Sequence, residues 1–162
     1  MGKWRTLFES NLPPLEQREY GEQYEFGPPA TEEQLAAAES ALGVPLPQDV
    51  RELLAEFNGV RYTTRASRQH GHEPYILYLD IEHLTVEVPR YFRTCGNVLP
   101  PEENLRKVVF VCQSNGFGDL WGACVADVAG NRTGEVVRLD HEVGELEASH
   151  PSLAEFVRTG RK

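Results

Sequence analysis

Cysteine and long hydrophobic runs are scarce in this chain of 162 residues. Its three cysteines, Cys95, Cys112 and Cys124, are odd in number and contain no C-x-x-C pair, which excludes a disulfide framework and a paired-cysteine metal or redox motif. No stretch approaches the ~20 apolar residues of a membrane span. Lys3 and Arg5 are not followed by the apolar run of a signal peptide. These absences predict a protein of a reducing compartment, the cytoplasm.

Positive charge is also in short supply. The chain has 16 Lys and Arg against 25 Asp and Glu, a net charge of −9, which repels phosphate backbones and anionic lipid. We therefore expect neither nucleic acid nor a membrane as partner. The imbalance lies in residues 1–60, because residues 61–162 are nearly balanced. An acidic surface of this kind either keeps the protein soluble or steers a basic protein partner, and charge alone leaves both open.

The remaining composition is that of an ordinary globular protein, with 40% hydrophobic and 25% charged residues. We expect one domain over residues 1–162, in which residues 1–27 form an N-terminal helix and an acidic arm. The apolar spacing of Trp4, Leu7 and Phe8 predicts the helix. Residues 16–30 read as a loop, acidic and aromatic, of the kind found in solvated arms and in docking surfaces.

A pair of helices is the clearest local signal. Thr31 and Gln34 form a capping box, in which each side chain satisfies a backbone N–H at the helix start. Gly43 can supply the left-handed residue that ends this helix. A second helix follows Pro47 and stops at Asn58-Gly59. The apolar stripes are Leu35, Ala38 and Leu42 in the first helix, and Val50, Leu53, Leu54 and Phe57 in the second.

The second half of the chain predicts an antiparallel meander. Glycine-rich turns at 114–119 and 130–134 separate apolar, β-rich segments, as in hairpins. Residues 60–73 read as a polar loop. The expected strands are 75–79, 108–112, 120–127 and 135–139.

Two further helices are expected beside this meander. Leu84, Val88 and Phe92 recur at helical spacing, although Pro89 interrupts the pattern. Near the C-terminus Ser152 starts a helix with a capping box formed with Glu155, and Leu153, Phe156 and Val157 give that helix its buried face.

Candidates for metal binding or catalysis are few. His70 and His72 would need further ligands from elsewhere to hold a metal ion. Cys112 and Cys124 lie in apolar strands without an adjacent base, which is typical of buried core cysteines. We expect no catalytic residue, no cofactor and no metal.

Two polar motifs in the meander also read as structural. Gly116-Phe117-Gly118 lacks the third glycine, the lysine and the following helix of a nucleotide-binding loop. Asp140-His141-Glu142 reads as a polar strand end, because successive strand residues point to opposite faces and would not converge without a turn. Asp119 is expected to orient the glycine turn or to contact a partner.

These residues in this order resemble the SUKH superfamily, which includes the fungal Smi/Knr cell-wall-assembly regulator domain and many bacterial immunity proteins. The resemblance covers about residues 28–160. It rests on Pro29-Ala30-Thr31-Glu32, on Leu42-Gly43-Val44-Pro45-Leu46-Pro47 with the Asn58-Gly59 stop, on Gly118-Asp119, on Gly134-Glu135-Val136-Val137 and on Ser152-Leu153-Ala154-Glu155-Phe156. It implies an α+β domain in which helices pack on a mainly antiparallel β-sheet. For bacterial members it also implies neutralisation of a cognate toxin, commonly a nuclease.

Three functions follow as hypotheses. The first is an immunity protein that binds a basic toxin domain, the second is an intracellular regulatory scaffold like the fungal relatives, and the third is a hydrolase that uses the His70–His72 loop. The resemblance carries over no partner-binding residues, so these are chosen by charge and position. The expected partner contacts are Glu16, Glu19, Glu22, Glu25, Glu102, Glu103 and Asp119.

Overall fold

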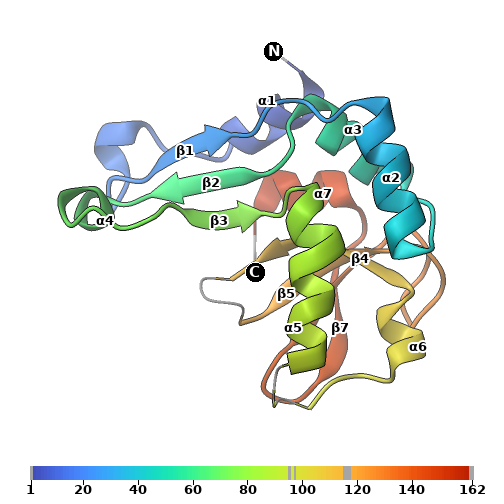
Figure 1. The fold of residues 1–162 in the computed structure, drawn as a ribbon. Helices are drawn as coiled ribbons and strands as arrows, with labels where there is room; N and C mark the ends of the chain where they lie inside the picture. Colours follow the sequence, from blue (N-terminus) through green and yellow to red (C-terminus); the bar gives the residue numbers. More distant parts are fainter. Residues whose placement is uncertain (1, 95, 97, 115–117, 161–162) are drawn as a thin grey trace.

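The computed structural model describes residues 2–94, 96, 98–114 and 118–160. Seven strands form one sheet, and each strand pairs in antiparallel fashion with the next along the chain (Figure 1). This confirms the α+β fold and the predicted meander. The strands are β1 (Gln23–Phe26), β2 (Val60–Thr63), β3 (Tyr75–Tyr78), β4 (Val108–Gln113), β5 (Leu120–Cys124), β6 (Val136–Asp140) and β7 (Glu145–His150).

Helices connect and cover this sheet. Two of the short elements are a 3-10 turn, η1 (Leu15–Gln17), and a π-helical turn, η2 (His83–Glu87). The α-helices are α1 (Lys3–Glu9), α2 (Glu32–Leu42), α3 (Gln48–Glu56), α4 (Arg65–Gln69), α5 (Val88–Thr94), α6 (Glu102–Leu105) and α7 (Leu153–Thr159).

The capping signals locate the predicted helix starts. The Gln34 backbone N–H donates to Thr31 Oγ1 at 3.2 Å, and the Thr31 N–H donates to Gln34 Oε1 at 2.9 Å. Gly43 ends α2 at φ 70°, a left-handed conformation that glycine adopts without a Cβ clash. Ser152 caps α7 by accepting from the Glu155 N–H, whereas the Glu155 carboxylate pairs with Arg158.

The core lies between the sheet and the layer formed by α1, α2, α3 and α7. Phe156 of α7 is fully buried and packs against Tyr78 of β3, Trp121 of β5 and His150 of β7. The predicted stripe of α3 supplies Val50, Leu53 and Leu54, all at most 1% exposed. Tight packing of this kind gives the domain its stability, because burial of apolar area is the dominant favourable term in folding.

Cys112 and Cys124 are buried in β4 and β5, as predicted. Burial raises the pKa of the Cys124 thiol to about 11, so it stays protonated and acts as a small apolar side chain. Cys95 lies outside the described residues.

Two predicted loops were wrong, because they contain strands of the sheet. Residues 16–30 include β1 and residues 60–73 include β2 and α4; the pairs run from Gln23 with Thr63 to Phe26 with Val60. Each strand is only four residues long, so its alternation is too brief to read from the sequence. Contacts with a distant segment stabilise these strands. The Phe8 ring of α1 packs edge-on against the rings of Tyr24 and Phe26, with ring centroids 5.2 and 5.5 Å apart.

Pro89 changes the predicted helix that contains it. A proline has no N–H to donate to the residue four positions earlier. The chain therefore forms the π-helical turn η2, in which the Val88 N–H bonds to the His83 carbonyl five residues back, and Pro89 falls in the first turn of α5, where a proline is tolerated.

Candidate functional site

A cluster of charged side chains joins β5, β6 and β7 at one end of the sheet. Leu120 of β5 pairs with Leu139 of β6, so Asp119 and Asp140 follow at the same end. Arg138 lies one residue further inside, opposite Glu147 of β7. Antiparallel register thus gathers groups that are up to 28 positions apart in the sequence.

Arg138 is the centre of this cluster. Its Nη1 lies 3.3 Å from Asp119 Oδ2, and its Nη2 lies 3.3 Å from Asp140 Oδ2 and 2.6 Å from Glu147 Oε2. One guanidinium therefore shares its charge among three carboxylates on three strands. Charge-assisted hydrogen bonds are the stronger kind, so Arg138 ties the strands together.

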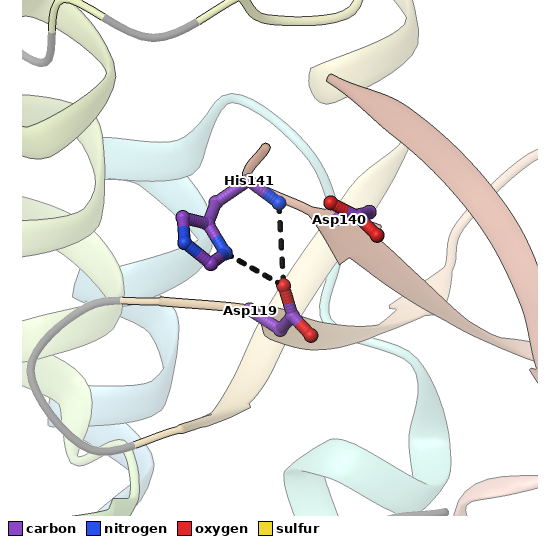
Figure 2. A group of neighbouring side chains, drawn as sticks. All are labelled: Asp119, Asp140 and His141. Carbon is purple, nitrogen blue, oxygen red and sulfur yellow. Dashed lines mark hydrogen bonds and ion pairs between the residues drawn. The ribbon is translucent and has the colours of Figure 1, made fainter. Parts of the chain in front are cut away.

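His141 completes the cluster (Figure 2). Its Nδ1 lies 2.8 Å from Asp119 Oδ1, and its backbone N–H donates to the same oxygen at 3.3 Å. The hydrogen bond to Asp119 raises the pKa of His141 above its ordinary value. The contact with Asp119 therefore favours the protonated form of His141.

Asp140-His141-Glu142 is a polar strand end, as predicted, and a turn brings Asp140 and His141 close to Asp119. The strand ends at Asp140, and residues 141–144 form a turn in which Gly144 has φ 71°. Asp140 Oδ1 accepts the Glu142 N–H at 2.9 Å, which lowers the pKa of Asp140 and fixes the turn. Glu142 is exposed. Three consecutive polar residues lie at the end of this strand, and the turn could have been predicted from them.

Asp119, Asp140 and His141 offer three possible metal ligands whose atoms lie within 4.8 Å of one another. The same atoms are engaged within the protein, because Arg138 pairs with both carboxylates and His141 Nδ1 contacts Asp119. This arrangement describes an ion network that stabilises the sheet. Within the described residues, His70 and His72 have no third ligand at metal-binding distance, although their rings lie 5.9 Å apart.

Gly118 fits closely against this cluster. A Cβ at Gly118 would lie 2.5 Å from Ser114 Oγ and 3.5 Å from His141 Cε1. The other two residues of the glycine motif, Gly116 and Phe117, lie outside the described residues.

The early carboxylates Glu16, Glu19, Glu22 and Glu25 lie along η1 and β1 and are exposed, apart from a half-exposed Glu22. The segment that contains them packs beside β2 and α4. Glu25 is the register partner of Arg61, the Arg65 N–H donates to the Tyr20 carbonyl at 2.8 Å, and Arg68 Nη2 donates to the Gly21 carbonyl at 3.0 Å. The Arg61 side chain itself pairs with Asp80 at 3.6 Å, and the four carboxylates have no ion-pair partner among the described residues.

Glu102 and Glu103 lie elsewhere. They form the first turn of α6, and Glu102 Oε1 lies 2.5 Å from Arg106 Nη2. Figure 1 shows α6 at the opposite side of the fold from β1 and α4. The seven expected contact residues therefore occupy three separate places: the η1–β1 arm, α6, and the Arg138 cluster that contains Asp119.

Comparison with known proteins identifies the family. Residues 29–159 match the model of the SMI1 / KNR4 family (SUKH-1). No curated protein matches the chain. Within the described residues, every helix is too short or too polar to cross a membrane. The family includes immunity proteins, and its members are generally non-catalytic immunity or regulatory proteins. Because the match covers most of the sequence and the fold agrees with it, the chain belongs to the SMI1 / KNR4 family (SUKH-1).

Proposed function

We propose that this chain is an immunity protein that neutralises a cognate toxin, with a nuclease as the first candidate, by direct binding in the cytoplasm. The observation that carries this proposal is the match of residues 29–159 to a family that includes immunity proteins. The chain acts by occlusion and not by catalysis. Its buried free thiols, Cys112 and Cys124, suit a reducing compartment.

The partner of an immunity protein with net charge −9 is expected to be basic. Exposed carboxylates raise the rate at which such a partner arrives, because their field acts before contact. The proposed contacts are the η1–β1 arm, the α6 carboxylates and Asp119. The arm ranks first, since its glutamates are exposed on a segment that also presents Tyr20, 60% exposed, and aromatic residues are common in the cores of interfaces.

The test is co-expression with the toxin encoded by the neighbouring gene. Cells that make the toxin alone should stop growing, and cells that also make this chain should grow. The two proteins should co-purify as a stable complex. A catalytically inactive toxin gives the matched binding control, because it separates complex formation from survival.

Two outcomes would overturn the proposal. If the neighbouring toxin neither binds nor loses toxicity, the immunity role fails. If no toxin is encoded nearby and the chain instead co-purifies with one signalling protein of its own cell, the regulatory scaffold replaces it.

A further inference from the structure

A groove of about 580 Å³ lies over β4, between the C-terminal end of α2, the η2–α5 segment and α6. Its volume falls in the range of small-molecule sites. Val109 and Phe110 of β4 form its floor together with Val88. Leu42, Phe92 and Leu105 form its walls and are only partly buried. Apolar side chains on three elements are thus left facing a common space.

Pro89 lines the groove together with Val88 and with Leu84 of η2, the π-helical turn that directly precedes α5. π-helical turns inside helices occur frequently at functional sites. The π-helical turn is therefore a second feature of the groove, besides its apolar lining, that is typical of a functional site.

Charge at the groove is opposite in sign to that of the molecule. Arg93 and Arg106 line it against a single acid, Glu102, in a chain of net charge −9. Arg106 pairs with Glu102. Arg93 has no ion-pair partner in the part of the chain that the structure describes, and its guanidinium stays available to an anion. An apolar floor beside an available arginine complements a ligand that is apolar at one end and negatively charged at the other.

We propose that this groove binds a small amphiphilic anion, an alkyl chain that carries one carboxylate. The chain lies on Val109 and Phe110 between Leu42 and Leu105, and the carboxylate pairs with Arg93. Each methylene added to the alkyl chain should strengthen binding about fourfold until the groove is full.

Isothermal titration of the full chain with octanoate and decanoate, below their micellar concentrations, tests this proposal. Decanoate has two more methylenes than octanoate and should bind about fifteenfold more tightly. Arg93→Gln should weaken decanoate binding about tenfold, whereas Arg90→Gln should leave it unchanged, because Arg90 pairs with Glu87 on the same segment and does not line the groove. Decyltrimethylammonium, with the same tail and a cationic head, should bind the native chain more weakly than decanoate.

A second pair of variants tests the location. Ala41 is an exposed residue of α2 that lines the groove, so Ala41→Trp should fill the groove and abolish decanoate binding. Ala36→Trp adds the same side chain elsewhere on α2, at an exposed position outside the groove, and should bind normally. Melting temperatures of both variants show whether the fold is intact, and Arg93→Gln serves as the test if Ala41→Trp does not fold.

Three results would overturn the proposal: no saturable binding of decanoate, equal binding of the cationic and anionic tails, or equal loss in the two tryptophan variants. No arm of this experiment uses a toxin, so its failure leaves the proposed immunity function untouched.

Discussion

At the scale of single residues, Asp119 shows how partners decide a role. The sequence left it between orienting a turn and contacting a partner. In the structure Oδ1 accepts from the His141 backbone and contacts its ring, while Oδ2 pairs with Arg138. Both oxygens are engaged within the protein. Asp119 therefore links two strands, and any contact it makes with a partner remains a proposal.

Asp119→Asn should lower the pKa of His141, because the hydrogen bond to the carboxylate is what raises it. A histidine whose pKa is raised by folding adds stability below its unfolded value of about 6.5, and this contribution is lost as pH rises through the folded value. The variant should therefore lose more stability at pH 5.5 than at pH 8.5. Histidine NMR titration and urea unfolding at the two pH values measure both effects.

Glu147→Gln is the matched control for Asp119→Asn. It removes another carboxylate from Arg138 without contacting His141. The His141 pKa should stay close to its native value in this variant. An equal fall in both variants would mean that the general field of the cluster, and not the Asp119 hydrogen bond, sets the titration.

At the scale of elements, helix caps act locally and could be predicted from the sequence. The effect of a proline could be predicted only in part. The α2 box depends on two hydrogen bonds between Thr31 and Gln34, and the position of η2 depends on the missing N–H of Pro89. The first needs only two residues at the right spacing. The second depends on how the segment around Pro89 packs in the folded domain. The sequence therefore predicted a helix and missed its π-helical turn.

Thr31→Ala should destabilise the domain by about 1 kcal/mol, because a helix N–H loses its cap. Thr31→Ser keeps the hydroxyl and should cost much less. Chemical denaturation midpoints at constant m-value measure the difference. Equal stability of the alanine and native chains would show that water replaces the cap without loss.

At the scale of the whole molecule, some of the excess carboxylates in the described part of the chain form ion pairs within the fold and others do not. Many N-terminal carboxylates are paired within the fold, such as Glu39 with Arg51 and Glu52 with Lys3. The arm carboxylates Glu16, Glu19, Glu22 and Glu25, by contrast, have no ion-pair partner within the described residues, and Arg61 beside them pairs with Asp80. Their charge therefore stays open to a basic partner.

Replacing Glu16, Glu19, Glu22 and Glu25 together with Gln should slow association with a basic toxin about tenfold at low salt. The effect should vanish near 0.5 M salt, where the screening length is only a few ångströms. The melting temperature should barely change, because exposed ion pairs contribute little. Stopped-flow association across a salt series is the measurement.

The double variant Glu102→Gln and Glu103→Gln is the control at α6. It removes negative charge on the far side of the fold and should slow association less than the quadruple variant does. If it alone slows association, the partner docks at α6 and the arm serves solubility.

The sequence by itself determined the features that depend on neighbours along the chain. The capping box of Thr31, the left-handed stop at Gly43, the stripe of α3 and the main hairpins are all set within about ten residues, and all are present. Family membership followed from the same local features.

Tertiary structure alone decided what depends on contacts between distant segments. Strands β1 and β2 are too short to show a pattern and form because Phe8 and their own pairing bury Tyr24 and Phe26. The Arg138 cluster and the arginines beside the acidic arm likewise exist only after the strands pair. Long-range pairing brings together charges that no spacing in the sequence relates, and this is why the candidate site could not be read from the chain alone.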